Sequence, residues 1–219
     1  MLWEFLQNDL EKLEIEGIEH PDSAVVCARI ADYQSDLLQA EREGLEEMHP
    51  QRVASYSTGR FLAHRAQKLL GFPVDAVGRR ERVPTWPPGA MGSITHSQTL
   101  AGVVLSGSLR AVGIDIERVD RVQPNLYSKL FTASEQRLLA AAPHLATMMF
   151  SAKEAGYKAI YPHGEKFIGF QEAEIIPDEA TRTFAIRYLG EHAPNELLER
   201  GVGRWQAHDD HLLTLFVID

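Results

Sequence analysis

The chain of 219 residues contains a single cysteine, Cys27, which excludes a disulfide framework and a metal site built from several thiolates. Its 31 acidic residues outnumber the 22 lysines and arginines, so the net charge is −9. Nucleic acid is therefore not expected as the main partner, because contacts with a phosphate backbone need a basic surface. We interpret Cys27, which lies within the apolar stretch AVVCARI, as a buried structural thiol.

Long apolar runs and several common catalytic signatures are also missing. No stretch approaches the roughly 18 apolar residues that a membrane-spanning helix needs, and the first residues lack the basic start and apolar core of a secretion signal. The chain has no G-x-x-x-x-G-K-[ST] phosphate loop, no G-x-S-x-G elbow and no H-E-x-x-H zinc motif. We expect a cytoplasmic protein without a transmembrane segment, and its 44% of hydrophobic residues suffice for a substantial core.

Apolar periodicity and turn signals predict an α+β fold in two halves of similar size, 1–107 and 108–219. Helices are expected over 1–14, over 37–70 with a break at His49-Pro50, after a capping box at Thr132 and Glu135, and over 144–161. Strands are expected at 23–30, 93–97, 100–106 and 111–117, with Gly107-Ser108 turning the last two into a hairpin. Two further hairpins are expected at the end of the chain, over 172–189 and 203–219.

The strand segment GIDIE (113–117) carries two carboxylates in an otherwise apolar run. Asp115 and Glu117 are two residues apart, so they project from the same face of a strand. Two carboxylates this close repel each other, and unless both are solvated one is protonated or a cation lies between them. A hard cation such as Mg²⁺ fits such a pair and typically brings a phosphate ligand with it. The alternative is an amphipathic strand with a solvated outer face.

A second motif, FSAKEAGYKAIY (150–161), places Glu154 and Lys158 four residues apart on one side of a predicted helix. Met148 and three alanines form a neighbouring stripe that permits close packing. Two simpler interpretations compete with a functional one. Glu154 and Lys158 could form a surface ion pair, or Ser151 and Glu154 could form a capping box at a helix start.

A basic stripe and a histidine complete the set of candidate residues. Arg52, Tyr56, Arg60 and His64 recur every four residues along one predicted helix, and arginine forks suit phosphate oxygens. The alternative is a solvated face that answers the acids of 41–47. In GSITHS (92–97), His96 is a core residue, an exposed one or a phosphate contact. The stiff Trp-Pro-Pro loop after the arginines of 79–82 could frame a nucleotide.

Taken together, these segments resemble the 4′-phosphopantetheinyl transferases, in particular the larger monomeric kind that serves siderophore, surfactin and polyketide synthases. That family shows a G-[IV]-D-[IV]-E strand followed by a [WF]-x-x-K-E-A-x-x-K-A helix, here GIDIE (113–117) and FSAKEAGYKA (150–159). Its siderophore-type members add an arginine-rich helix, here QRVASYSTGRFLAHRA, and a W-P-x-G-x-x-G-S-[IVM]-T-H segment, here WPPGAMGSITH (86–96). The ordered motifs cover roughly 37–176. One departure is His64, where family members often have arginine; the nearest arginine here is Arg65.

The resemblance implies two similar halves related by a pseudo-two-fold axis, each an antiparallel sheet with a long helix, and an active site in the cleft between them. The substrate would be coenzyme A, and the acceptor a serine of an apo acyl or peptidyl carrier protein. Mg²⁺, with Mn²⁺ as an alternative, would be held by Asp115, Glu117 and Glu154. Glu154 would also act as the base and Lys158 would stabilise charge on the diphosphate. The residues implied to bind phosphates of coenzyme A are Arg52, Arg60, Arg82, Thr95, His96 and Lys158.

Two other functions use the same residues. A Mg²⁺-dependent phosphohydrolase would need the acids but no carrier protein. A non-catalytic cofactor-binding protein would be expected to lack one of the three acids or the lysine, and all four are present. Carrier proteins are commonly acidic, as this chain is, so docking is expected to use a local apolar or basic patch.

Overall fold

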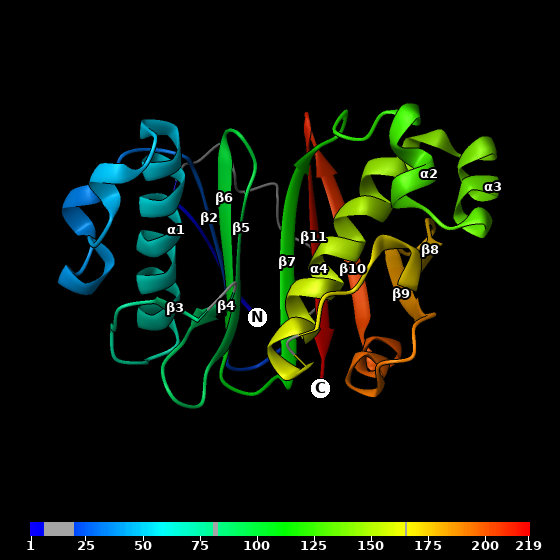
Figure 1. Cartoon of the computed structure of the whole chain (residues 1–219). Coiled ribbons are helices and arrows are strands. Elements are labelled where there is room, and N and C mark those ends of the chain that lie inside the picture. The colour runs from blue at the N-terminus through cyan, green and yellow to red at the C-terminus, as the bar shows by residue number, and fades with distance from the viewer. Residues whose placement is uncertain (7–19, 81–82, 165) are drawn as a thin grey trace. The chain divides into compact units, whose positions relative to one another are not determined.

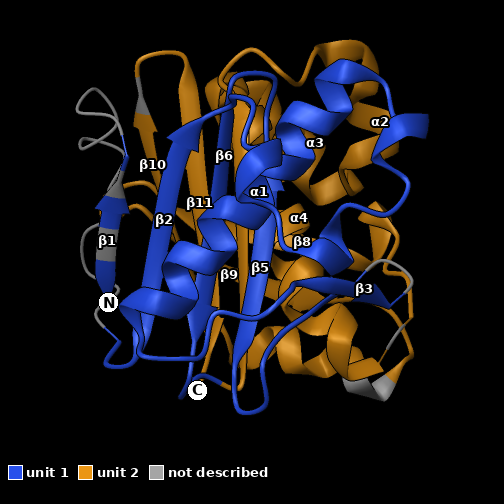
Figure 2. Ribbon diagram, turned by 90° about the vertical axis from the view of Figure 1, so that its left-hand side faces the viewer, with its two compact units in different colours: residues 1–109 blue, residues 110–219 orange. Residues whose placement is uncertain are grey.

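The computed structural model describes residues 1–6, 20–80, 83–164 and 166–219, and it divides the chain into two compact units, Met1–Leu109 and Arg110–Asp219 (Figure 2). Each unit combines a sheet with one long helix, so the predicted α+β class is confirmed. The division falls two residues beyond the boundary expected from the sequence. Among the described residues, no helix is long and apolar enough to cross a membrane.

The sheet of the first unit has the strand order β1-β2-β6-β5. Its strands are β1 (Leu2–Phe5), β2 (Ser23–Arg29), β6 (Leu100–Ser106) and β5 (Met91–His96). All neighbours are antiparallel except β1 and β2, which run parallel. The apolar strands β2 and β6 are buried along almost their whole length, as continuous apolar runs predict. Cys27 on β2 is 1% exposed, which confirms a buried thiol.

Helix α1 (Pro50–Leu69) packs across β2, β6 and β5, and Figure 2 shows it lying on this sheet. Pro50 occupies its first turn, where the missing amide hydrogen costs nothing, and His49 is the N-cap. Gly71 follows the helix with a φ of 74°, a left-handed conformation that glycine adopts without strain. The predicted break at His49-Pro50 and the stop at Gly71 are therefore confirmed. A small hairpin, β3 (Gly78–Arg80) with β4 (Val83–Thr85), follows the helix.

Two predictions for the first unit are wrong. Residues 2–5 form β1 instead of the start of a helix, and residues 7–14 of the predicted helix lie outside the described residues. The segment before His49 folds into three short 3₁₀ helices, η2 (Gln34–Asp36), η3 (Gln39–Glu41) and η4 (Leu45–Glu47), instead of one α-helix. Two local features interrupt the helix there. The Glu41 carboxylate accepts a hydrogen bond from the amide of Leu38, and Gly44 adopts a left-handed φ of 75° that a continuous α-helix does not allow.

The second unit is built on an antiparallel sheet with the order β7-β11-β10-β9-β8 (Figure 1). Its strands are β7 (Ala111–Arg118), β11 (His211–Ile218), β10 (Val202–His208), β9 (Thr183–Tyr188) and β8 (Ala173–Asp178). The two expected terminal hairpins are confirmed as β8–β9 and β10–β11. The expected hairpin of 100–106 with 111–117 is wrong, because β6 pairs with β2 and β5 on its two edges while β7 pairs with β11.

Helix α4 (Ala146–Gly164) lies against β7 and β11 of this sheet (Figure 1). The predicted stripe of small residues makes this approach close: Ala152, Ala155 and Ala159 are at most 1% exposed. A Cβ at Gly113 would overlap the carbonyl oxygen of Ala155, so β7 needs glycine there. Because alternate residues share a face of a strand, the side chains of 115 and 117 also lie on the face that α4 covers.

The second unit also contains shorter helices. They are η5 (Pro124–Leu126), α2 (Tyr127–Leu130), α3 (Ala133–Ala141), η6 (Pro143–Leu145), η7 (Phe170–Glu172) and η8 (Ala193–Arg200). Thr132 caps α3, accepting from the amide of Glu135 while the Glu135 carboxylate accepts from the amide of Thr132. The predicted capping box is therefore confirmed.

Candidate active site

The first part of the candidate site lies under α4, where β7 presents its two carboxylates. Asp115 is 4% exposed, and Ile114 and Ile116 are buried on the opposite face of the strand. The expectation that both acids share one face is met, but that face is covered by a helix. The alternative of a solvated outer face is therefore wrong for Asp115.

Both oxygens of the Asp115 carboxylate have partners on α4. The ammonium of Lys158 lies 2.6 Å from Oδ1, and the hydroxyl of Ser151 donates to Oδ2 at 2.8 Å. Ser151 also shares a 2.8 Å hydrogen bond with the hydroxyl of Thr214 on β11. Since α4 begins at Ala146, Ser151 is interior to the helix and the alternative capping box with Glu154 is wrong. Lys158 pairs with Asp115, which replaces the simple surface ion pair as its main interaction.

The pKa values of the other two acids, Glu117 and Glu154, are shifted upward. Burial, reinforced by the charge of Asp115, raises the pKa of Glu117 to about 7. Burial also raises the pKa of Glu154, although the nearby charge of Lys158 acts in the opposite direction. Arg121 lies near the same cluster, with its Nε 3.7 Å from Oε2 of Glu117. Such shifts report an excess of buried negative charge that a bound cation would relieve.

These three acids fit a hard divalent cation in chemistry, because they offer carboxylate oxygens and mutual repulsion that a cation removes. Their present arrangement is not a ready-made metal site: within the described part of the chain, no three histidine, cysteine, aspartate or glutamate side chains form a metal-binding group. Lys158 occupies one oxygen of Asp115 instead. A cation bound through that oxygen would compete with Lys158 for Asp115.

An aromatic wall borders this cluster. The ring of Phe150, one helical turn before Glu154, lies 5.7 Å from the ring of Phe170. The guanidinium of Arg121 lies 5.8 Å from the centre of the Phe150 ring. Arg121 therefore contacts both the acids and the wall, a role that the sequence patterns did not reveal because the residue lies in a loop.

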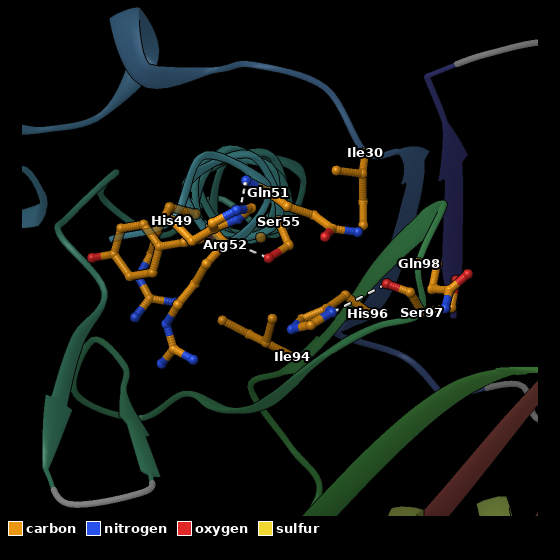
Figure 3. Close-up of a pocket in the computed structure, with 12 residues that line it drawn as sticks. Ile30, His49, Gln51, Arg52, Ser55, Ile94, His96, Ser97 and Gln98 are labelled. Atoms are coloured by element: carbon orange, nitrogen blue, oxygen red, sulfur yellow. Dashed lines mark hydrogen bonds between the residues drawn. The ribbon is translucent and has the colours of Figure 1, made fainter. Parts of the chain in front are cut away.

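The second part of the candidate site is a cavity of about 470 Å³ in the first unit (Figure 3). Arg52 and Arg60 of α1 and His96 of β5 line it, so the structure brings together three of the predicted phosphate-binding residues. Figure 3 shows the helix residues facing His96 and Ile94 across the cavity. The remaining lining residues are Ile30, His49, Gln51, Ser55, Tyr56, Gly59, Ser97 and Gln98.

Arg60 is the most deeply buried cation of this cavity. It is 8% exposed, and its guanidinium lies 4.5 Å from the centre of the Tyr56 ring. Its Nε is buried with no hydrogen-bond partner among the described residues. A buried donor without a partner is costly, so this group favours an anionic ligand that accepts from it. The alternative of a solvated face is wrong for Arg60.

Other predicted residues lie outside this cavity. Thr95 is 4% exposed and alternates with Ile94 and His96, so it lies on the opposite face of β5 and does not line the cavity. Arg82 falls outside the described residues. Trp86 of the Trp-Pro-Pro loop packs on Gly92 and donates its indole N–H to the Gly92 carbonyl at 2.9 Å.

The structure gives partners to His64, which departs from the family pattern, and to the neighbouring Arg65. His64 is 9% exposed and lies 3.0 Å from the buried carboxylate of Glu41, which also accepts from the amide of Val77. Arg65 pairs with Glu4 of β1. Neither residue lines the cavity. His64 does pair with an acid of 41–47, but the pair is buried, so it does not form the solvated face of the alternative interpretation.

Comparisons with known proteins identify the family. A model described as the 4′-phosphopantetheinyl transferase superfamily matches residues 111–215, and a model of the 4′-phosphopantetheinyl transferase N-terminal domain matches residues 40–106. The chain is 30% identical over 213 residues to 4′-phosphopantetheinyl transferase Npt of Nocardia iowensis, an alignment that covers 88% of this chain and 95% of that protein.

Two further relatives have similar identity. 4′-Phosphopantetheinyl transferase Svp of Streptomyces mobaraensis is 32% identical over 181 residues, covering 77% of this chain and 73% of that protein. Enterobactin synthase component D of Salmonella typhimurium is 32% identical over 172 residues, covering 75% and 71%. The chain belongs to the 4′-phosphopantetheinyl transferase superfamily, and it is an enzyme of that class.

Proposed function

We propose that this enzyme transfers the phosphopantetheine arm of coenzyme A to a serine hydroxyl of an apo acyl or peptidyl carrier protein, in a Mg²⁺-dependent reaction that releases 3′,5′-ADP. One observation carries the proposal: buried Asp115 and partly buried Lys158 form an ion pair at 2.6 Å, which joins the two family signatures at one point beneath α4. Glu154 and Glu117 complete a cluster whose shifted pKa values fit a cation-dependent phosphoryl transfer.

We assign the 3′-phosphate and the diphosphate of coenzyme A to different residues. Arg52, Arg60 and His96 line the cavity of the first unit and would bind the 3′-phosphate end of coenzyme A. Lys158, released from Asp115, would pair with the diphosphate. A magnesium ion held by Asp115, Glu117 and Glu154 would neutralise charge on the diphosphate. We assign no part of coenzyme A to Thr95, which lies on the opposite face of β5, or to Arg82, which falls outside the described residues.

The chemical step exchanges one phosphorus–oxygen bond for another. The serine Oγ of the carrier attacks the phosphorus next to pantetheine, the bond from that phosphorus to the bridging oxygen breaks, and 3′,5′-ADP leaves with the electron pair. The serine proton passes to Glu154, whose pKa is raised by burial, which makes its carboxylate a stronger base. Phosphoryl transfer of this kind depends mainly on positioning and charge stabilisation.

The test mixes the purified enzyme with coenzyme A, Mg²⁺ and apo carrier proteins from peptide, polyketide and fatty-acid synthases, and weighs each carrier. A carrier that gains the mass of one phosphopantetheine arm supports the proposal. If no carrier gains mass while coenzyme A is hydrolysed, a phosphohydrolase is the better description. If neither change occurs, the non-catalytic alternative is favoured.

A further inference from the structure

Lys153 stands immediately before Glu154, yet its side chain is 3% exposed and directed into the protein. Its ammonium donates to the carbonyl of Leu130 at 3.0 Å, to Oε2 of Glu135 at 2.6 Å and to the carbonyl of Phe170 at 2.6 Å. An ammonium has three donors and no acceptor, so these three bonds use its full capacity. Lys153 therefore has no donor left for a substrate.

Both carboxylate oxygens of Glu135, the partner of Lys153, also accept further hydrogen bonds. Its Oε2 also accepts from the amide of Thr132 at 2.8 Å, and its Oε1 accepts from the amide of Ile175 at 2.8 Å. The carboxylate is 1% exposed. Through this pair, α4 is connected to the end of α2, the start of α3, β8 and the η7 turn.

A buried ion pair of this kind is not explained by stability alone. Removing two charges from water is costly, and well-packed apolar residues of similar size often stabilise a fold as well or better. The pair instead fixes positions: the charged hydrogen bonds of Lys153 hold the carbonyls of Leu130 and Phe170 at defined places. These two carbonyls belong to two separate short helices, α2 and η7, which an apolar side chain could not hold in this way.

The Phe170 carbonyl matters because its residue forms the aromatic wall beside Glu154. The Phe170 ring lies 5.7 Å from that of Phe150, and Phe150 precedes Glu154 by four residues on the same side of α4. Lys153 thus links the turn of α4 that carries Glu154 to the segment that borders it. A shift of about 1 Å in such a surround can lower a rate by about a hundredfold.

We propose that Lys153 is a positioning residue of the transfer reaction: it holds the Phe170 turn and the end of α2 against α4, so that the aromatic wall stays fixed beside Glu154. The inference rests on the proposed function. Among the described residues, the Lys153 ammonium contacts none that is assigned to coenzyme A, so its loss is expected to lower kcat and to leave the KM for coenzyme A unchanged.

The test compares three variants of the full chain: Lys153→Met, the double variant Lys153→Met/Glu135→Gln, and Leu139→Ala. The double variant removes the uncompensated buried charge and carries the test if Lys153→Met does not fold. Leu139 is 1% exposed in the hydrophobic core cluster that also contains Phe150, and its side chain makes none of the hydrogen bonds of Lys153 and Glu135. Its variant is therefore a control for simple destabilisation. Unfolding in urea, kcat and the KM for coenzyme A are measured for each, at a temperature where all remain folded.

Both Lys153 variants are expected to lose kcat by about tenfold or more, with the KM for coenzyme A within about twofold of the parent value. Leu139→Ala is expected to keep kcat. Equal losses of kcat in Leu139→Ala would show a merely structural role, and a raised KM with unchanged kcat would show a substrate contact; either overturns the proposal. Parental kcat in the Lys153 variants does so as well.

Amide hydrogen exchange separates this inference from the proposed function. Exchange of 169–172 is expected to accelerate in Lys153→Met and in the double variant, and to stay near the parental rate in Leu139→Ala. If the parent enzyme transfers nothing to any carrier, the proposed function fails whatever the exchange shows. If transfer is normal but exchange of the turn is unchanged in the Lys153 variants, the positioning role fails alone.

Discussion

The ammonium of Lys158 lies 2.6 Å from Oδ1 of Asp115, so the residue proposed to bind diphosphate and a proposed metal ligand neutralise each other within the second unit. Lys158 also donates to the carbonyl of Ile114 at 3.3 Å, which holds it over β7. A divalent cation bound through the same carboxylate oxygen would compete with Lys158. The diphosphate of coenzyme A offers Lys158 an alternative partner, so substrate and metal should bind cooperatively.

This competition predicts that Lys158→Met binds metal more tightly than the parent enzyme when coenzyme A is absent. Titration with Mn²⁺, followed by the loss of the electron paramagnetic resonance signal of the unbound ion, should give an affinity higher by about tenfold, equivalent to about 1.4 kcal/mol. Lys158→Arg keeps the charge and serves as the control, with an affinity near the parent's. Unchanged or weaker Mn²⁺ binding by Lys158→Met would show that the lysine does not occupy the metal position.

Asp115 and its hydrogen-bond donor Ser151 are expected to differ in their effects. Asp115→Asn keeps the shape of the side chain but removes the charge, and should lower transfer by about a hundredfold to a thousandfold. Ser151→Ala removes only the 2.8 Å hydrogen bond that orients the carboxylate, and should cost about tenfold to a hundredfold. Carrier mass measured at saturating Mg²⁺ checks both. Near-normal transfer by Asp115→Asn would contradict the metal assignment.

The raised pKa of Glu117, about 7 against an ordinary value of 4.5, predicts how stability depends on pH without metal. Between about pH 4.5 and 7 the folded state binds more protons at Glu117 than the unfolded chain does. The free energy of unfolding therefore falls as pH rises through this window, and the raised pKa of Glu154 acts with the same sign. Urea unfolding at pH 5 and pH 7.5 in a chelator measures the slope.

Glu117→Gln removes the main titrating group and should flatten that dependence. The matched control is Glu196→Gln, because Glu196 is exposed on η8 and remote in sequence from the acid cluster. A slope that persists unchanged in Glu117→Gln would mean that another group causes it.

The sequence could predict α4 and the common face of Asp115 and Glu117, because helix and strand periodicity are local properties. It could not predict which strand pairs with β7. The expected partner, 100–106, is adjacent in the chain, but the actual partner is β11, about a hundred residues away. The pairing of Lys158 with Asp115 likewise depends on the close packing of α4 on Gly113, a tertiary contact.

The same distinction explains the outcomes in the first unit. Arg52 and Arg60 are two four-residue steps apart along α1, which places both on one side of the helix, and both line the cavity. His96 reaches that cavity from β5, whereas Thr95, its neighbour in the motif, lies on the other face of the strand. Their adjacent positions in the motif do not show which of the two lines the cavity. Strand alternation shows it once the face of β5 that borders the cavity is known.

The buried guanidinium of Arg60 predicts selectivity for the 3′-phosphate of coenzyme A. Arg60→Met should weaken binding of coenzyme A by about tenfold to a hundredfold, since a charge-assisted bond is worth about 1.5–3 kcal/mol. Dephospho-coenzyme A, which lacks that phosphate, should bind the variant and the parent enzyme similarly. Calorimetric titration of both ligands checks this, with Arg65→Met as the control, because Arg65 lies on the same helix but pairs with Glu4 outside the cavity. Equal weakening of both ligands by Arg60→Met would place the arginine at another part of the substrate.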